Sequence, residues 1–206
     1  IRAITQWVLA HALEQCAAWR RESMAMNVSL NISARDLMDV ELPERFAALL
    51  LLHGCEAGWI TLELTESAIL DDPEHAIDNL RRLHALGCRI AIDDFGTGYS
   101  SLAYLRRLPV HELKIDKSFI LGVAHDRSNA VIVRSTIDLA HNMGLSVVAE
   151  GVEDEATVDR LRGLGCDMVQ GYLLCRPLAA EDLTVWMKTS PWMRATREVE
   201  PLRRVV

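Results

Sequence analysis

The sequence lacks the cysteine pattern of a disulfide-rich or zinc-binding domain. Its five cysteines are scattered, their number is odd, and no two of them form a Cys-x-x-Cys pair. This spacing argues against a disulfide framework or a zinc site and indicates reduced thiols in a reducing compartment. The five are Cys16, Cys55, Cys88, Cys166 and Cys175.

Long hydrophobic stretches are also missing. The longest uninterrupted apolar run covers residues 46–52, which is far too short to span a bilayer. The first residues, 1–7, have neither a basic region followed by an apolar block nor a cleavage signature. We therefore expect a soluble, cytoplasmic segment with no membrane contact of its own, although the parent protein could be anchored to a membrane.

An excess of positive charge is absent as well, since the formal net charge is −7. Proteins that bind nucleic acid through a basic surface displace counterions from the phosphates, so this balance argues against DNA as a partner. A phosphate-ester substrate would be repelled by nearby carboxylates unless a divalent metal offset that repulsion.

No Pro/Gly/Ser linker or low-complexity segment interrupts the chain before about residue 190, which favours one domain. Short β-branched runs alternate with longer amphipathic segments, the pattern of parallel βαβ units. The expected strands are Met26–Asn31, Ile60–Leu64, Arg89–Asp93, Glu112–Ile115, Ser146–Glu150 and Met168–Gln170. The expected helices between them are Arg35–His53, Pro73–Leu86, Ser101–Leu108, Asn129–Met143 and Glu155–Leu164.

Each strand finishes on a polar or ionisable residue, which favours a closed α/β barrel over an open doubly wound sheet. In a (β/α)8 barrel of the TIM type, several strands contribute side chains to one mouth, whereas an open sheet gathers its ligands at one crevice. The strand-end residues are Asn31, Glu63, Asp93, Asp94, Lys114, Glu150 and Gln170.

Six strands do not close such a barrel, because it needs eight. The chain opens instead with a helical pattern over Ile1–Arg20, for which we expect a buried face of Ile4, Val8, Leu9, Ala12 and Cys16. We therefore predict that the N-terminal strands of the barrel are missing from this chain.

The strand-end residues are mostly oxygen ligands, which suit hard cations such as Mg²⁺ or Mn²⁺ better than zinc. Each has a structural alternative: Glu63 could be a solvated or capping residue, Asn31 could cap the helix that follows it, and Lys114 could be a surface or ion-paired lysine. Their coincidence at the same strand end favours function.

The string IDDFGTGYSSLAYLRRLP, followed by LKIDKSF, AEGVE and QGYLLCRPL, resembles the EAL-domain family, as do NVSLNISA and ELTES upstream. The similarity extends in the same order over nearly the whole chain up to about residue 190. It implies a (β/α)8 barrel that hydrolyses cyclic di-GMP to linear pGpG with two Mg²⁺ or Mn²⁺ ions.

The resemblance also implies a role for each matching residue. Asn31, Glu63 and Glu150 would bind the first metal, Asp93 both metals and Asp94 the second. Lys114 would contact the attacking water. Three further residues complete the set: Gln170 and Glu153 would line the site, and Glu66 would hold the loop Phe95–Ser100.

Two features depart from the family pattern. The Glu-x-Leu motif, which supplies one more ligand to the first metal, is absent because the chain starts after it. His111 stands where the family often has Asp, before the strand rather than at its active end. A catalytically impaired domain that acts as a cyclic di-GMP receptor or protein-interaction module therefore stays open. An enolase-like enzyme would also use strand-end carboxylates and a lysine, but the DDFGTGYSSL string and the strand order argue against it.

The family resemblance further implies a homodimer and upstream sensory or GGDEF-type domains in the full protein. We assign residues 1–190 to the EAL phosphodiesterase domain, incomplete at its N-terminus, and 191–206 to a C-terminal tail. That tail could be an extra helix, a disordered end or an interface element.

Overall fold

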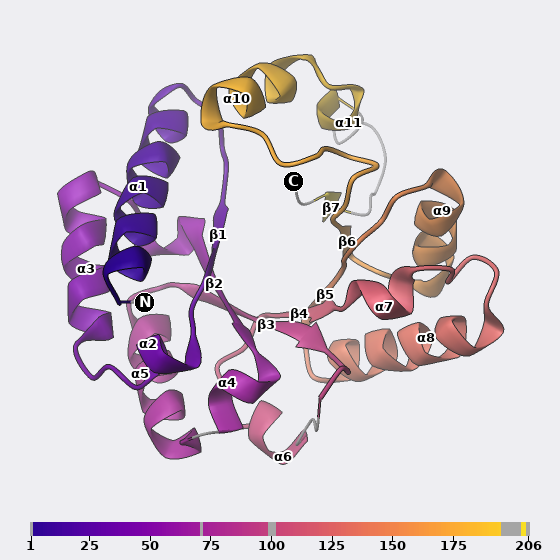
Figure 1. Cartoon of the computed structure of the whole chain (residues 1–206), viewed down its shortest axis with the longest axis horizontal. Coiled ribbons are helices and arrows are strands. Elements are labelled where there is room, and N and C mark those ends of the chain that lie inside the picture. Colours follow the sequence, from indigo (N-terminus) through magenta and orange to yellow (C-terminus); the bar gives the residue numbers. More distant parts are fainter. Residues whose placement is uncertain (1, 71, 99–101, 195–202, 205–206) are drawn as a thin grey trace. The chain divides into compact units, whose positions relative to one another are not determined.

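The computed structural model describes residues 2–70, 72–98, 102–194 and 203–204 (Figure 1). The chain divides into two compact units, Ile1–Glu112 and Leu113–Val206, which we call unit 1 and unit 2. Each unit alternates parallel strands with helices, as the sequence predicted. Among the described residues, no helix combines the length and apolar content needed to cross a bilayer.

Unit 1 contains the elements α1 (Arg2–Arg21), β1 (Val28–Asn31), α2 (Ala34–Leu37), α3 (Leu42–His53), the 3₁₀ turn η1 (Ala57–Trp59), β2 (Ile60–Thr65), α4 (Glu66–Leu70), α5 (Pro73–Ala85), β3 (Arg89–Phe95) and α6 (Leu102–Leu105). The boundary between the units falls within β4 (Glu112–Ile115). Unit 2 continues with α7 (Lys117–Ile120), α8 (Arg127–Asn142), β5 (Ser146–Ala149), α9 (Glu155–Leu164), β6 (Met168–Val169), α10 (Ala180–Thr189), α11 (Pro191–Arg194) and β7 (Arg203–Arg204).

The strands of unit 1 pair in parallel in the order β1–β2–β3. Their register places apolar side chains beside apolar ones and polar side chains in the neighbouring row. Leu30, Leu62 and Ile90 are partners in one row, and all three are buried. Because side chains alternate between the two faces of a sheet, the next row presents Asn31, Glu63 and Ala91 on the opposite face. The sheet of unit 1 therefore has an apolar face and a face that carries polar groups.

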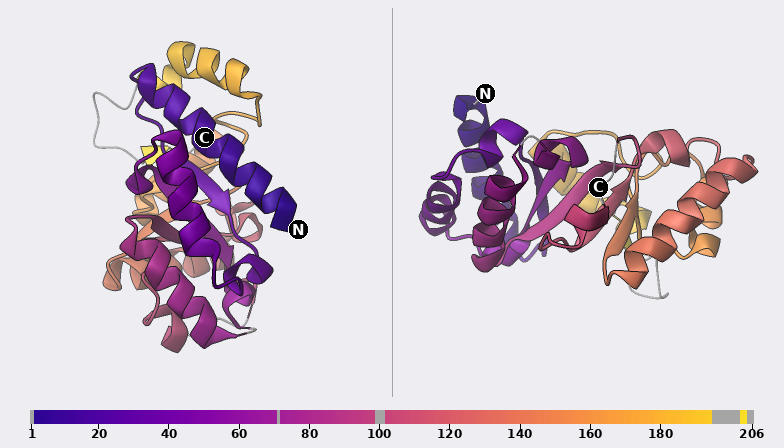
Figure 2. Two further views of the ribbon diagram at one scale, coloured as in Figure 1. Left: turned by 90° about the vertical axis from the view of Figure 1, so that its left-hand side faces the viewer. Right: turned by 90° about the horizontal axis from the view of Figure 1, so that it is seen from below.

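The helices α1, α3 and α5 lie beside one another along this sheet, as Figure 2 shows from two sides. Fully buried side chains such as Leu13 of α1, Phe46 of α3 and Leu80 of α5 supply the core between them. Burying a side chain of this size contributes about 1.5–3 kcal/mol. Packing of these helices therefore fixes the strands that carry the polar face.

The face of α1 that is buried differs from the expected one. Leu9 and Cys16 are buried as predicted, but Ile4 and Val8 are 67% and 40% exposed. Leu13 and Trp19 are buried in addition. The contact of α1 with α3 selects this face, and such a contact between distant segments is not encoded in the periodicity of α1 alone.

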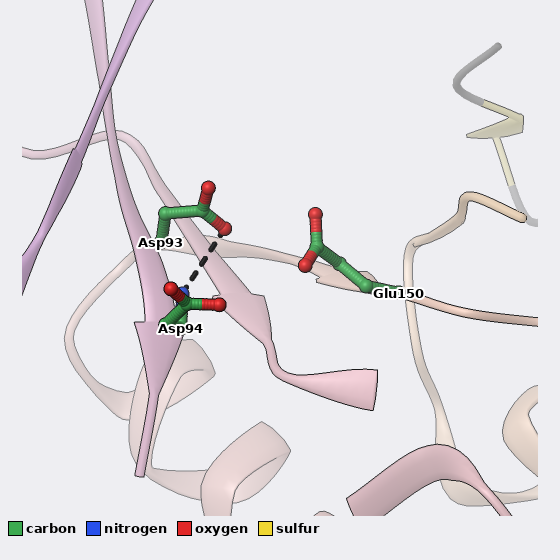
Figure 3. Close-up of side chains that lie close together, drawn as sticks. All are labelled: Asp93, Asp94 and Glu150. Atoms are coloured by element: carbon green, nitrogen blue, oxygen red, sulfur yellow. Dashed lines mark hydrogen bonds between the residues drawn. The ribbon is translucent and has the colours of Figure 1, made fainter. Parts of the chain in front are cut away.

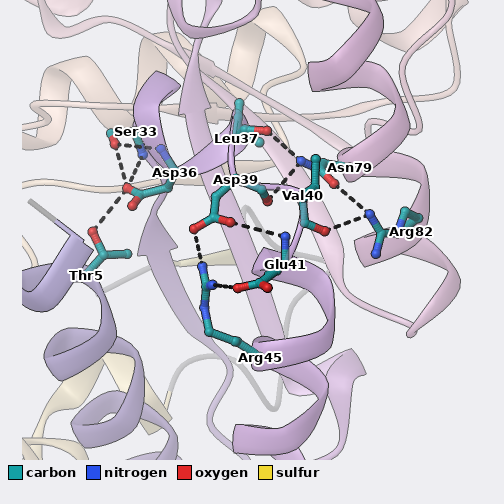
Figure 4. Close-up of polar contacts among 10 residues, drawn as sticks. All are labelled: Thr5, Ser33, Asp36, Leu37, Asp39, Val40, Glu41, Arg45, Asn79 and Arg82. Carbon is teal, nitrogen blue, oxygen red and sulfur yellow. Dashed lines mark hydrogen bonds and ion pairs between the residues drawn. The ribbon is translucent and has the colours of Figure 1, made fainter.

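The single helix predicted over Arg35–His53 is wrong, because the chain forms two helices, α2 and α3. Pro43 lies at the start of α3, and a proline ring inside a continuous helix would clash with the carbonyl four residues earlier, that of Asp39. Buried Asn79 of α5 stabilises the break by donating from Nδ2 to the carbonyl oxygens of Leu37 (2.6 Å) and Asp39 (3.2 Å) (Figure 4).

Arginines reinforce the same junction. Arg82 of α5 donates to the carbonyl of Val40 at 2.9 Å, and Arg45 of α3 pairs with Asp39 (Figure 4). Arg82 also pairs with Glu44. The backbone polar groups that the helix break frees therefore find partners within unit 1, as buried polar groups require.

Unit 2 has its own parallel strands, β5, β6 and β7, with α8 packed against both β5 and α9. Glycines end both helices: Gly144 follows α8 with φ 76° and Gly165 caps α9 with φ 84°. Of the segment 191–206, predicted as a tail, residues 191–194 form α11 and residues 203–204 pair with β6; residues 195–202 and 205–206 lie outside the described residues.

Candidate functional site

The polar residues at the carboxyl ends of β1, β2 and β3 lie on one face of the sheet in unit 1. Asn31 and Glu63 are direct register partners, and Glu63 is next to Ala91 on β3. Asp93 follows Ala91 by two residues, so its side chain is on the same face. Sequence reasoning predicted that these residues gather, and within unit 1 they share one face and one end of the strands.

The local structure around Asn31 excludes the capping alternative. Ser33, not Asn31, caps α2: its hydroxyl accepts from the backbone N–H of Asp36, whose carboxylate accepts from the backbone N–H of Ser33 in return. The same Asp36 carboxylate accepts from Thr5 of α1 at 3.1 Å. Asn31 is the last residue of β1, and its side chain is exposed for other use.

A pocket of about 490 Å³ opens beside Asn31 in unit 1. Hydroxyl groups of Thr5, Ser33, Thr65 and Ser67 line it together with apolar groups. Small-molecule sites have volumes of about 300–1,000 Å³ and mix apolar walls with a few polar groups. The pocket is therefore of a size and composition that suit a small ligand next to the polar strand ends.

Asp93 and Asp94 end β3 in a conformation that places both carboxylates on one side of the strand (Figure 3, which also draws Glu150 of unit 2). The backbone N–H of Asp94 donates to Oδ1 of Asp93 at 3.0 Å. Asp94 has a φ of 53°, in the left-handed region that aspartate tolerates better than most residues. This turn interrupts the strict alternation of side chains along the strand.

The turn after Asp94 is held by Glu66, the first residue of α4. The backbone N–H of Gly96 donates to Oε1 of Glu66 at 2.9 Å. Thr97 closes the turn, because its Oγ1 donates to the Asp94 carbonyl at 2.9 Å. Glu66 thus contacts the described part of the loop Phe95–Ser100; residues 99 and 100 lie outside the described residues.

In unit 2, Lys114 of β4 and Glu150, the first residue after β5, form a buried ion pair. Lys114 Nζ lies 2.6 Å from Oε1 of Glu150, and the two side chains are only 3% and 17% exposed. The backbone N–H of Glu150 donates to the carbonyl of Ile115 at 3.1 Å, which fixes the chain where the carboxylate begins. The surface-lysine alternative for Lys114 is therefore wrong.

Gln170 and Glu153 occupy different surroundings. Gln170 is the first residue after β6, and its backbone N–H donates to the carbonyl of Ala149 at 2.9 Å. It is half-buried at the same strand end as Glu150. Glu153 is exposed in the loop after β5. Unit 2 thus aligns Lys114, Glu150 and Gln170 at its strand ends and leaves Glu153 at the surface.

Sequence reasoning overlooked one contact close to these residues. The guanidinium of Arg176 lies over the ring of Tyr172, in the turn that follows Gln170. No sequence pattern signals this contact, because it depends on the conformations of the two side chains.

Comparisons with known proteins agree with this arrangement. A sequence model of the EAL domain matches residues 1–177. The bifunctional diguanylate cyclase/cyclic di-GMP phosphodiesterase MucR of Pseudomonas aeruginosa is 44% identical over 181 residues, which are 87% of this chain and 26% of MucR. The cyclic di-GMP phosphodiesterase PA2567 of the same organism is 36% identical over 91% of this chain and 32% of that protein.

A solved structure of the MucR phosphodiesterase in complex with c-di-GMP superposes with a TM-score of 0.85 at 44% identity. The match covers 89% of this chain and 74% of the solved one, whereas the chain spans only about a quarter to a third of the curated relatives. The structural neighbours are EAL domains, whose fold is the TIM-barrel-like α/β fold predicted from the strand ends. From the matched motifs, the fold and these relatives together, the chain belongs to the EAL domain family.

Proposed function

We propose that this chain is the phosphodiesterase domain of a cyclic di-GMP signalling protein, and that it hydrolyses one phosphodiester bond of cyclic di-GMP to give linear pGpG. The observation that carries the proposal is the row of oxygen-bearing side chains, Asn31, Glu63 and Asp93, on one face at the carboxyl ends of β1–β3. Relatives that are named as cyclic di-GMP phosphodiesterases share 36–44% of their residues with the chain over this region.

The donor set fits two Mg²⁺ or Mn²⁺ ions. Asparagine and carboxylate oxygens are the ligands that such hard cations prefer, and the set contains neither His nor Cys. Asn31, Glu63 and Glu150 would hold the first ion, Asp93 would hold both, and Asp94 the second. Asp93 and Asp94 are adjacent at the end of the unit 1 sheet, and Glu150 of unit 2 would add its carboxylate to such a centre.

When bound, such ions would supply Lewis acidity, lower the pKa of a water nucleophile and offset the repulsion between the carboxylates of a chain with net charge −7 and an anionic substrate.

The chain's own residues complete the site. The Lys114 ammonium, held by Glu150 at 2.6 Å, would orient the attacking water and stabilise charge that develops on the phosphoryl group. Glu66 would keep the turn at Gly96 in place and thereby fix the direction of Asp94. Gln170 and Glu153 would line the site around the substrate.

We further propose that the full protein carries upstream sensory or GGDEF-type domains and acts as a homodimer in the cytoplasm. The relatives support the first part, since MucR is named as a bifunctional cyclase and phosphodiesterase and an oxygen sensor protein of Escherichia coli, DosP, is 34% identical over 92% of this chain.

The experiment compares Asp93→Asn and Glu150→Gln with Asp182→Asn, an exposed carboxylate on α10 that serves as the matched control. The protein that contains this domain is incubated with cyclic di-GMP and Mn²⁺, and pGpG is quantified by chromatography. We expect both site variants to lose about 100-fold or more in turnover and the control to keep it. Undiminished turnover in either site variant contradicts its assigned role.

Tight binding of cyclic di-GMP without hydrolysis by the unaltered protein, at saturating Mn²⁺, would instead identify a receptor. Activity that requires no divalent cation would remove the metal assignment while leaving the substrate in place.

A further inference from the structure

Two of the cysteines lie close together in unit 1, on segments that are distant in the sequence. Cys16 of α1 is fully buried, whereas Cys55, which follows the end of α3, is half-buried. Cys55 Sγ donates to the carbonyl oxygen of Leu13 at 3.1 Å, in the turn of α1 that contains Cys16. Each thiol also affects the pKa of the other, which requires the two sulfur atoms to be near one another. The packing of α1 against α3 therefore brings two thiols together (Figure 2).

The two thiols differ in how readily they ionise. Burial, and then the neighbouring Cys55 thiol, raises the pKa of Cys16 to about 11. Burial also raises the pKa of Cys55, but a hydrogen bond from Cys16 and the nearby Arg20 guanidinium lower it. The thiolate is the reactive form of cysteine, so Cys55, which is also the more accessible of the two, is the thiol that reacts first.

A pocket of about 570 Å³ opens beside this pair. Ala17, the residue after Cys16, and Gly54, the residue before Cys55, both line it. Its volume is within the range of small-molecule sites, about 300–1,000 Å³. Trp59, which directly precedes β2, also lines the pocket, so it lies at the amino end of this strand. The polar residues proposed for catalysis in unit 1 are at the carboxyl ends of the strands, and the pocket is therefore a separate site.

The charged side chains of the pocket suit an anionic molecule that also carries an ammonium group. Arg20 and Arg21 line it together with Glu14. The Arg20 guanidinium is held in place over the ring of Trp59, 4.6 Å from the ring centre. Arg21 donates from Nε to the carbonyl of Ala17 at 3.3 Å, and within the described part of the chain its two terminal nitrogens have no acceptor. Guanidinium groups bind carboxylates, and the Glu14 carboxylate attracts an ammonium group.

We propose that Cys55 and Cys16 form a thiol-modification site for a small anionic disulfide, the disulfide of a cysteine-containing peptide, which binds in this pocket. The Cys55 thiolate would attack one sulfur of the ligand, form a mixed disulfide and release one peptide as its thiolate. Cys16, after losing its proton, would attack the Cys55 sulfur, close a Cys16–Cys55 disulfide and release the second peptide. The two released thiolates take up the two protons that the cysteines lose.

The electrons balance without any other oxidant, because two protein thiols are oxidised while one disulfide is reduced to two thiols. Such a bond would join α1 to the segment that follows α3. Disulfides in reducing compartments are usually transient and redox-sensing, which agrees with thiols that are reduced at rest.

The test uses oxidised glutathione, a peptide disulfide with more carboxylates than ammonium groups. The protein that contains this domain is incubated with it in non-denaturing buffer, and its proteolytic peptides are analysed by mass spectrometry. We expect a link between Cys16 and Cys55 that dithiothreitol reverses. Its rate of formation should rise about tenfold from about pH 7 to 8, because the thiolate fraction rises by this factor below the pKa. Absence of the link, or mixed linkages among all cysteines in equal yield, would overturn the proposal.

Three variants test the order of the two steps. Cys16→Ala should stop at the mixed disulfide and keep one glutathionyl group on Cys55, and Cys55→Ser should leave Cys16 unmodified. Cys175→Ser removes another half-buried thiol, in unit 2, and should form the link in full yield. Modification of Cys16 in Cys55→Ser would contradict the assigned order. Circular dichroism checks the fold of each variant, and the link in the unaltered protein is measured without any substitution.

Arg21→Gln tests whether the pocket selects the reagent. It should slow the reaction with oxidised glutathione about threefold or more and change the reaction with 2-hydroxyethyl disulfide, which is uncharged, by less than about twofold. Arg81→Gln, at an exposed position of α5 in the same unit, is the control and should react like the unaltered protein with both reagents. Equal slowing with both reagents, or no slowing with either, would overturn the role of the pocket.

Discussion

Lys114 Nζ lies 2.6 Å from Oε1 of Glu150, and the lysine side chain is 3% exposed. An ion pair with so little exposure to water stabilises both charges, because removing one partner of a buried pair is costly. The pair therefore links the stability of unit 2 to the residues that we place in catalysis.

Replacing the lysine should separate these two roles. Lys114→Met is expected to cost about 3 kcal/mol in the free energy of unfolding, since it removes the ammonium that lies 2.6 Å from the Glu150 carboxylate. The double variant Lys114→Met/Glu150→Gln should recover most of this loss but no activity. Urea denaturation and pGpG formation measure the two quantities; recovery of activity in the double variant would contradict the catalytic assignment.

Removing the Glu66 carboxylate should loosen the turn that begins at Asp94. Glu66→Ala deprives the Gly96 N–H of a charged acceptor, and hydrogen bonds of this kind contribute about 1.5–3 kcal/mol. We expect the Mn²⁺ concentration for half-maximal activity to rise about tenfold, and Glu66→Gln, which keeps a neutral acceptor, to show a smaller rise. Glu181→Ala on α10 is the control, and an unchanged Mn²⁺ dependence in Glu66→Ala would argue against the coupling.

A methyl group should distinguish two glycines of unit 2. Gly171→Ala would force a Cβ atom to within 2.1 Å of the Val152 carbonyl oxygen and should destabilise the protein by about 3 kcal/mol. Gly163 lies within α9 with no atom near its Cβ position, so Gly163→Ala should stabilise by about 0.5–1 kcal/mol. Thermal melting of both variants provides the comparison, and equal melting temperatures would show that the turn adapts.

Acid should weaken the contact between His111 and β3. Burial, then the neighbouring Arg89 and His84, lowers the pKa of His111, whose Nδ1 accepts from the Ile90 N–H at 3.1 Å. In the unfolded chain this histidine has its ordinary pKa of about 6.5, whereas in the folded chain it stays neutral to lower pH. Above about pH 6.5 the histidine is neutral in both states, so its contribution to stability does not change with pH. The contribution falls as pH drops below about 6.5 towards the lowered folded pKa.

His111→Asn offers a matched control for that pH dependence, because an amide oxygen can accept from Ile90 without titrating. Urea denaturation between about pH 5 and 8 should give a shallower loss of stability on the acid side for this variant. Parallel curves for both proteins would assign the acid sensitivity to other groups.

Strands, helices and the family were predictable from the sequence where they depend on local patterns. β4 and α9, for example, have the predicted bounds. The helix break before Pro43 and the buried face of α1 were not predicted, since Asn79 and the contact with α3 determine them from distant parts of the chain.

Part of the candidate site was likewise predictable from the sequence, and part was not. The strand-end rule located Asn31, Glu63 and Asp93, because parallel strands end at one edge. The pairing of Lys114 with Glu150 and the stacking of Arg176 on Tyr172 depend on side-chain conformation, which the strand pattern does not determine.

Side chains alternate between the two faces of the unit 1 sheet, so the pairing register of the strands determines which residues lie on the polar face. If β1 slipped by one residue against β2, Leu30 would stand beside Glu63 and Asn31 would turn towards the helices. Such a shift would remove a proposed metal ligand and bury an amide in the same step. An insertion or deletion within β1 should therefore be tolerated far less well than one in the exposed turn at Gly54, where no atom lies near the Cβ position.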